Sequence, residues 1–324
     1  MTGLGRDLVL AWRRLLKAPA FTAFSVLTLA IGIGAVTAIY SVVHAALGPP
    51  PGLSDAGRVM NIRRATFGSG PIVTLSWPDY QLFRQQQTSF SSVTGWTYLV
   101  ESVAAEGGTL SGWGEVVDGD YFSTLGVPAS RGRMLTQEDD QPGAPPVAVI
   151  AYVAWQRLFG GADDVIGKIV KTNGQSVRVV GVAPREFAGM FNGGLVRTMT
   201  WQPLAAARTF TGPNNVNFDA NSRDHRWVFV QGRLAPGRTL AQANTEIAAM
   251  GRQFDAALQQ EKAGVPQAGV MTASQTRTSW NVQPAARVMG VPDQILKPLV
   301  AALAIAVGLV LLVACTNLTN LMLA

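Results

Sequence analysis

The 324-residue chain has little of the chemistry that disulfide-bonded and metal-binding proteins need. It contains one cysteine, Cys315, and two histidines, His44 and His225. One cysteine cannot form an intrachain disulfide, and two histidines cannot build a multi-histidine metal site. Charge is also scarce, because 14% of the residues are Asp, Glu, Lys or Arg, against roughly 25% in an average soluble protein. This composition excludes a disulfide scaffold and a histidine-rich metalloenzyme, and it is unusual for a soluble protein.

Two long stretches, residues 18–47 and 298–324, contain no charged residue. A helix needs about 20 predominantly apolar residues to cross a bilayer, and both stretches are longer. A cleaved signal peptide is the alternative for the first stretch, but its apolar core would be about twice the usual length. The sequence therefore predicts a first transmembrane helix at 18–47 and a second at 298–324.

The placement of basic residues predicts how the chain crosses the membrane. Before the first stretch, a single acid, Asp7, opposes four basic residues: Arg6, Arg13, Arg14 and Lys17. Such a cluster keeps the N-terminus in the cytosol, so residues 48–297 should be extracytoplasmic. In the rest of the chain, basic and acidic residues are nearly equal in number, so the sequence shows no excess of positive charge of the kind that binds nucleic acid. We therefore expect a membrane protein with an extracytoplasmic central domain and no nucleic-acid partner.

Residues 1–17 also carry an apolar stripe at helical spacing, made of Leu4, Leu8, Trp12 and Leu15. This pattern predicts a cytosolic amphipathic helix lying on membrane lipid. A disordered start that carries only topogenic charges is the alternative.

Polar residues gather in the cytosolic half of the second predicted span, among them Asn317 and Asn320. Lipid offers amides no hydrogen-bond partner, so such residues usually face other helices. The alternative is interfacial residues at a fraying helix end. We expect the native chain to continue beyond Ala324 into a basic cytosolic segment and further helices.

The segment between the spans mixes strand and helix patterns without regular alternation. Three local signals are clear: Ser76 with Asp79 as a helix start, Asn173-Gly174 as the turn of a hairpin, and Thr239 with Gln242 as a capping box. Strands are expected at 58–64, 97–105, 146–151, 168–172, 175–182, 227–234 and 282–289, with a short helix after a cap at Asp120. The pattern predicts an α+β extracytoplasmic domain of two subdomains.

Motifs for nucleotide binding, hydrolysis or metal binding are absent from the sequence. The nearest approach to a phosphate loop, Gly167-Lys168, lacks the first glycine and the Ser or Thr after the lysine. No Gly-x-Ser-x-Gly, His-Glu-x-x-His or Cys-x-x-Cys motif occurs. We therefore expect no catalytic residue, no cofactor-binding residue and no metal ligand, and we expect that the chain is not an enzyme.

Two acidic runs leave a choice of interpretation. Glu138, Asp139 and Asp140 follow Thr136, and Asp163-Asp164 follows two glycines. A calcium site is the functional interpretation, and a helix start, where carboxylates favour the helix dipole, is the structural one. His225 is expected at the surface. Core or interface packing is expected for Trp77, Trp96, Trp113, Trp155, Trp201, Trp227 and Trp280.

Three segments carry a resemblance to a known family. They are LSWPDYQLFRQQQTSFSSVTGW (75–96), VVDGDYFSTLGVPASRGRMLTQEDD (116–140) and PVAVIAYVAWQRLFGGADDVIGKIVKTNGQSVRVVGVAPREFAGM (146–190). They resemble the MacB-type periplasmic core domain of FtsX-like ABC transporter permeases. The apolar runs at both ends resemble the first two spans of such permeases, particularly the long duplicated ones of acidobacteria.

The resemblance implies a permease subunit of the mechanotransmission type. Such a subunit works with a separate P-loop ATPase and couples ATP hydrolysis to movement of a periplasmic domain, for export or extraction of a substrate that the sequence does not identify. Relatives have at least four spans, so the resemblance also implies further transmembrane helices or a second permease copy. A two-span sensor that binds an extracytoplasmic ligand, and a membrane-anchored enzyme, are the alternatives.

Overall fold

The computed structural model describes most of the chain between residues 19 and 285 and part of its last stretch. The described residues are 19–47, 50–66, 74–191, 197–207, 221–223, 225–262, 278–285, 298, 301–306, 308–309, 312 and 315–316. The chain divides into two compact units, one of Met1–Leu47 with Val291–Ala324 and one of Gly48–Gly290.

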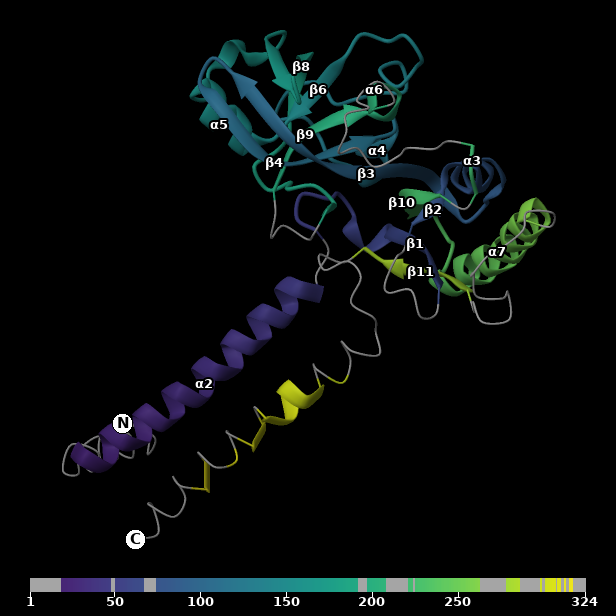
Figure 1. Cartoon of the computed structure of the whole chain (residues 1–324). Coiled ribbons are helices and arrows are strands. Elements are labelled where there is room, and N and C mark those ends of the chain that lie inside the picture. Colours follow the sequence, from purple (N-terminus) through teal and green to yellow (C-terminus); the bar gives the residue numbers. More distant parts are fainter. Residues whose placement is uncertain are drawn as a thin grey trace. The chain divides into compact units, whose positions relative to one another are not determined.

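In the first unit, helix α2 (Pro19–Leu47) has 29 residues (Figure 1). Within the described residues, no helix combines the length and the apolar character that crossing a bilayer requires. The predicted helix at 1–17 and the two amides at Asn317 and Asn320 lie outside the described residues. The two predicted spans and the cytosolic N-terminus stay predictions.

The second unit is built on one mixed sheet. Its strands are β1 (Val59–Thr66), β2 (Leu75–Ser76), β3 (Phe90–Ala105), β4 (Gly108–Val117), β5 (Arg131–Gly132), β6 (Val147–Ile150), β7 (Ile169–Thr172), β8 (Gln175–Val182), β9 (Thr198–Pro203), β10 (Arg226–Leu234) and β11 (Thr278–Pro284). In the described part of the chain they form an 11-stranded sheet in the order β11-β1-β10-β3-β4-β9-β6-β8-β5, with β2 on β10 and β7 on β3 and β8. The pairs β4–β9 and β6–β8 are parallel, and the other pairs are antiparallel.

Helices separate these strands at irregular intervals. They are α3 (Trp77–Gln86), α4 (Tyr121–Leu125), α5 (Tyr152–Phe159), α6 (Leu204–Ala207) and α7 (Leu240–Lys262), with short 3₁₀ turns η1 (Ala56–Arg58) and η2 (Asp163–Val165) (Figure 1). Because few strands are joined by the regular strand-helix-strand crossovers of an α/β fold, the predicted α+β class is confirmed.

The longest strand pair, which we call the β3–β4 ribbon (residues 90–117), runs through the middle of this sheet. Its pairing extends from Trp96↔Val117 to Ala105↔Gly108. The outer edge of β3 pairs first with β10 and then, at Val103 and Ala104, with β7. Strand β3 is much longer than the predicted 97–105, and it pairs with β10 along its first half and with β7 near its end.

The ribbon contributes to two hydrophobic cores. Trp96, Val103 and Val117 belong to a first core with Tyr121, Phe122, Trp155 and Trp201. Val93, Leu99 and Val116 belong to a second core with Tyr80, Phe83, Val228 and Phe254. Val116 and Val117 are successive residues and point to opposite faces, whereas Leu99 and Val103 share a face and enter different cores at different points along the ribbon. The described residues thus have two cores, in line with two subdomains, but one continuous sheet joins them.

The three local signals in the sequence are confirmed. The Ser76 hydroxyl accepts a hydrogen bond from the backbone N–H of Asp79 at 3.3 Å. Thr239 and Gln242 satisfy each other's backbone N–H groups, at 2.9 and 3.3 Å. Asn173 and Gly174, with φ of 48° and 85°, form the two-residue turn between β7 and β8.

Three expectations are wrong in detail. Thr136 precedes a turn at 137–140 rather than a helix, and the Asp139 carboxylate accepts hydrogen bonds from Arg133 and from the Thr136 N–H. Asp120 is the N-cap of α4, but its side chain does not cap the helix, since it pairs with Arg84. The last strand is β11, which begins and ends earlier than the predicted 282–289, of which 286–289 lie outside the described residues.

Candidate functional site

Three carboxyl groups are buried along the β3–β4 ribbon and at its end. Glu101 on β3 is 2% exposed, and Glu115 on β4 and Asp118 just after it are each 1% exposed. Carboxyl groups are almost never fully buried unless hydrogen bonds or opposite charges compensate for the lost water. We therefore take these three residues and their partners as the candidate functional site.

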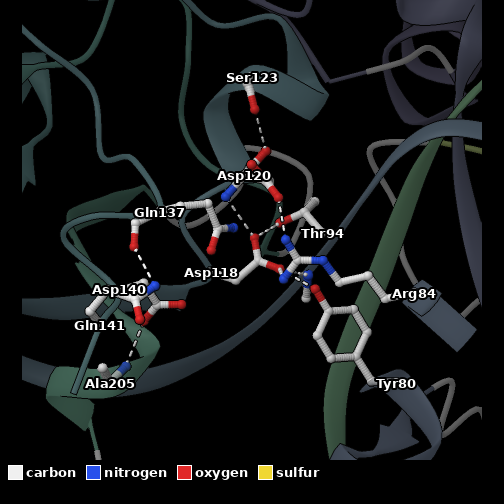
Figure 2. A network of polar contacts seen from close by, with 11 residues as sticks. Tyr80, Arg84, Thr94, Asp118, Asp120, Ser123, Gln137, Asp140, Gln141 and Ala205 are labelled. Carbon is white, nitrogen blue, oxygen red and sulfur yellow. Dashed lines mark hydrogen bonds and ion pairs between the residues drawn. The ribbon is translucent and has the colours of Figure 1, made fainter. Parts of the chain in front are cut away.

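The first cluster surrounds Asp118 (Figure 2). Its carboxylate accepts hydrogen bonds from the Thr94 hydroxyl at 2.6 Å, the Gly95 N–H at 3.0 Å and the phenol of Tyr80. It also accepts the backbone N–H of Asp120 at 3.0 Å, which starts α4. One side chain thus ties together α3, β3, β4 and α4.

Arg84 supplies the positive charge of this cluster. Its guanidinium contacts the Asp118 carboxylate at 3.7 Å and donates a hydrogen bond to Asp120 (Figure 2). Burial raises the pKa of Asp118, and the donors and Arg84 act in the opposite direction. Burial and the neighbouring Asp118 raise the pKa of Tyr80 well above its usual range, so its phenol stays a hydrogen-bond donor at every physiological pH.

The second cluster surrounds Glu115 on the face of β4 that contributes to the first core. Four groups donate to its carboxylate: the Tyr121 phenol, the Trp201 indole N–H at 2.8 Å, the Phe191 backbone N–H at 2.8 Å and the Thr198 hydroxyl at 3.0 Å. Burial raises the pKa of Glu115, and these four donors oppose that shift. Glu115 thereby joins β4, β9 and α4.

The third cluster surrounds Glu101 on the other face of the ribbon. Its carboxyl oxygens contact the Thr200 hydroxyl at 2.9 and 3.0 Å and the Gln202 amide nitrogen at 3.2 Å. The Gln202 amide oxygen in turn accepts from Thr172 on β7 at 3.2 Å. Burial, opposed by these contacts, raises the pKa of Glu101 to about 8. This cluster joins β3 to β9 and β7.

A group of aromatic rings lies beside the Glu115 cluster. The ring of Phe191, whose N–H binds Glu115, lies with its centroid 3.9 Å from Tyr98 and 4.9 Å from Trp113. Trp96 and Trp201 are fully buried, and Trp155, Trp227 and Trp280 are nearly so. Core packing is confirmed for these five tryptophans, while Trp77 and Trp113 are half-buried.

Of the residues that the sequence singled out, Asp120 joins this site by pairing with Arg84, and Trp201 joins it by donating to Glu115; the acidic runs and His225 do not. Asp139 is bound by Arg133, at 2.6 and 2.8 Å, and the Asp140 carboxylate accepts the Ala205 N–H at 2.7 Å. Asp163 and Asp164 form η2 and pair with Arg131 and Lys168, both at 2.8 Å. His225 is half-buried. Among the described residues, no three His, Cys, Asp or Glu are placed to hold a metal ion.

The three buried acids were not predicted from the sequence. The available signal was a single carboxylate inside an apolar strand pattern, at WTYLVESVAA for Glu101 and at SGWGEVV for Glu115. Their donors come from residues that are 86 positions away for Trp201 and 99 positions away for Thr200. The contacts of all three acids serve to hold neighbouring elements together, and each carboxyl group is closed off from solvent.

The chain is similar to proteins that are already known. Residues 22–250 match the family model of the MacB-like periplasmic core domain. A stretch of 76 residues is 42% identical to the macrolide export ATP-binding/permease protein MacB of Chlorobaculum tepidum. This alignment covers 23% of the chain and 11% of that relative, so the chain matches a small part of the relative's length.

Two solved structures are similar in fold. The periplasmic region of MacB from Actinobacillus actinomycetemcomitans is 16% identical, with a TM-score of 0.47, over 67% of this chain and 96% of that one. The extracellular domain of the noncanonic ABC-type transporter YknZ from Gram-positive bacteria is 12% identical, with a TM-score of 0.45, over 69% and 99%.

Proposed function

The chain belongs to the MacB-like periplasmic core domain family, as its sequence resemblance predicted, and from this premise we propose that it is the N-terminal part of an ABC transporter permease subunit. The observation that carries the proposal is the extent of the family match, which begins inside α2 and ends inside α7. The match therefore includes part of the first predicted span as well as most of the extracytoplasmic domain.

The proposed membrane attachment is supported by the surface of α2. Its side chains at Val26, Leu27, Ile31 and Ile33 are about 60% exposed. A row of exposed large apolar side chains is unfavourable in water and suits lipid or other apolar helices. Together with the basic cluster before residue 18, this supports an inner-membrane protein whose N-terminus is cytosolic and whose residues 48–297 are periplasmic.

We further propose that the second unit transmits movement rather than catalysing a reaction. The β3–β4 ribbon contributes to both cores, and the clusters of Glu115 and Asp118 fix it to β9, α3 and α4. Buried polar groups that are fully hydrogen-bonded stiffen a structure, because each broken contact would leave a group without a partner. A stiff ribbon of this kind can pass a displacement from one end of the domain to the other.

The energy source in this proposal is a separate P-loop ATPase, since the sequence contains no phosphate loop. Lys168, the nearest candidate, lies just before β7 and pairs with Asp164. Further transmembrane helices or a second permease copy would complete the membrane part. The substrate would be exported or extracted from the outer side of the membrane.

The test is purification of the tagged full chain from native membranes, with and without cross-linking. We expect a P-loop ATPase to co-purify and the isolated chain to hydrolyse no ATP above a detergent blank. ATP hydrolysis by the isolated chain that a Lys168→Ala variant abolishes would contradict the proposal. A Lys171→Ala variant, which removes an exposed lysine from the same hairpin, is the control.

A further inference from the structure

Glu101 differs from the other two buried acids in the partners that surround it. Glu115 accepts from four donors, including a backbone N–H and an indole N–H that cannot accept a proton. Asp118 has two backbone donors, two hydroxyl donors and the nearby cation of Arg84. Glu101 has a hydroxyl and an amide from two side chains, together with the backbone of Thr200. It therefore has the weakest support for a negative charge.

No charged side chain of the described elements around Glu101 acts on it. The residues that lie against its carboxyl group are Gly114 on β4 and Thr200 and Gln202 on β9, and Thr172 on β7 donates to Gln202 behind them. Glu115 follows Gly114 on β4, and Lys171 precedes Thr172 on β7. These nearest ionisable neighbours therefore point to the opposite faces of their strands. A neutral carboxylic acid suits this environment, because its O–H can donate to the Thr200 hydroxyl.

The packing leaves the carboxyl group little room to move away. A Cβ atom added to Gly114 would lie 2.6 Å from the carboxyl carbon of Glu101, which shows how closely the side chain crosses the β4 backbone. The strand that it contacts, β9, lies between β4 and β6 and so connects the ribbon to β6, β8 and β5. A change in the contact between Glu101 and β9 therefore affects how β6, β8 and β5 are connected to the β3–β4 ribbon.

We propose that protonation of Glu101 controls how firmly β9 is held against the β3–β4 ribbon: the neutral acid stabilises this contact, and ionisation weakens it. Ionisation moves the proton from the carboxyl group to solvent and leaves a buried anion with neutral partners only. The pKa of about 8 means that the closed form keeps the proton at neutral pH, and the stabilisation by the neutral acid is lost as the pH rises to about 8. The inference concerns the domain itself, so it does not depend on the proposed transport function.

The direction of the pH dependence follows from proton linkage. When β9 opens, Glu101 reaches water and regains an ordinary pKa, whereas the closed form keeps its proton up to about pH 8. Between the two pKa values, opening releases one proton, so the opening constant rises about tenfold for each pH unit. Above pH 8 both forms are ionised, and the dependence on Glu101 ends.

Amide hydrogen exchange of the full-length chain tests the proposal. The opening constant of the β9 amides at residues 198–202 is measured from pH 5 to 9, with each exchange rate divided by that of an unstructured peptide at the same pH; Pro203 has no amide hydrogen. The ratio between the native chain and Glu101→Gln should rise about tenfold per pH unit up to about pH 8 and then level off. Taking this ratio cancels the contribution of Glu115, which also contacts β9.

The control is Glu106→Gln, which makes the same chemical change at an exposed position beyond the end of β3. Its ratio to the native chain should not depend on pH. A flat ratio for Glu101→Gln would overturn the proposal. Since that variant could fail to fold, infrared spectroscopy of a chain that keeps Glu101, with labelled glutamate, provides a second measurement. Glu115→Gln removes the other buried glutamate, so in that variant a glutamic acid that stays protonated at pH 7 supports the proposal, and complete ionisation of all glutamates at pH 7 refutes it.

Discussion

The phenol of Tyr80 on α3 donates a hydrogen bond to the carboxylate of Asp118 at the end of β4, across 38 positions of the sequence. Both side chains are buried, at 0% and 1% exposure. The contact fixes the helix of the second core to the strand that also serves the first core. Asp118 thus connects the two hydrophobic cores, which is the role that the proposed transmission of movement requires.

Tyr80→Phe should destabilise the second unit by about 1–3 kcal/mol, because it removes a donor from a buried carboxylate and leaves the ring in place. Urea unfolding followed by tryptophan fluorescence measures the change. Tyr152→Phe is the matched control, since Tyr152 is half-buried and its hydroxyl has no hydrogen bond within the described part of the chain. Equal stability of Tyr80→Phe and the native chain would show that the Asp118 cluster does not hold the cores together.

The turn residue Asn173 has two roles that can be separated. Its positive φ suits the hairpin, and its amide accepts from the Ser102 N–H at 2.9 Å and donates to the Val100 carbonyl at 3.3 Å. Asn173→Gly keeps the turn and removes the side-chain amide, which should lower the free energy of unfolding by about 1 kcal/mol. Asn173→Ala should cost about 1–2 kcal/mol more, because alanine is strained at positive φ. Thermal unfolding of both variants tests this order, and equal losses would be inconsistent with two separate roles.

Gly251 on α7 should resist a substitution that normally stabilises helices. Alanine is better than glycine in a helix interior by about 1 kcal/mol. Here, however, an added Cβ would lie 2.1 Å from Cγ of Trp280 on β11. Overpacking of this kind costs about 1–3 kcal/mol, so Gly251→Ala should be neutral to destabilising. The exposed Gln253→Ala change on the same helix is the control, and a clear gain in stability for Gly251→Ala would disprove the packing of α7 on β11.

The carboxylate of Asp139 should stabilise the fold at neutral pH and not in acid. Burial would raise its pKa, but hydrogen bonds from Arg133 and Thr136 outweigh burial and hold the pKa below the usual range. The stabilisation is therefore complete above the unfolded pKa and is lost as the pH falls through the lower folded pKa. Because Arg133 is half-exposed, we expect Asp139→Asn to cost only about 1 kcal/mol at pH 7.

The measurement for Asp139 is the urea midpoint at pH 7 and in increasingly acidic buffers. The gap between Asp139→Asn and the native chain should close as the pH falls. Glu138→Gln removes an exposed carboxylate next to it and should leave the midpoint unchanged. If the urea midpoints of Asp139→Asn and the native chain differ as much in acid as at pH 7, the destabilisation has a cause other than the Asp139 charge.

Local features of this fold were predictable from the sequence because their information lies within four residues. Ser76 and Asp79, Thr239 and Gln242, and Asn173 and Gly174 each form their contacts within one turn. Strand β9 was missed although the polar and apolar residues of TMTWQP alternate. Its polar residues are buried too, by partners far away in the sequence, and the sequence alone does not show that burial. The buried acids were missed for the same reason: Glu101 and Glu115 are compensated by side chains that only the folded sheet brings near.

The placement of residues 48–297 outside the membrane is the claim on which the proposed function rests, and thiol labelling tests it most directly. In a Cys315→Ala background, single cysteines replace Ser111, which is exposed on β4, and Thr2 in the predicted cytosolic segment. An impermeant thiol reagent applied to intact spheroplasts should label Ser111→Cys, and it should label Thr2→Cys only after the membrane is opened. Labelling of Thr2→Cys in intact spheroplasts, with Ser111→Cys protected until lysis, would contradict the proposed topology and the permease function with it.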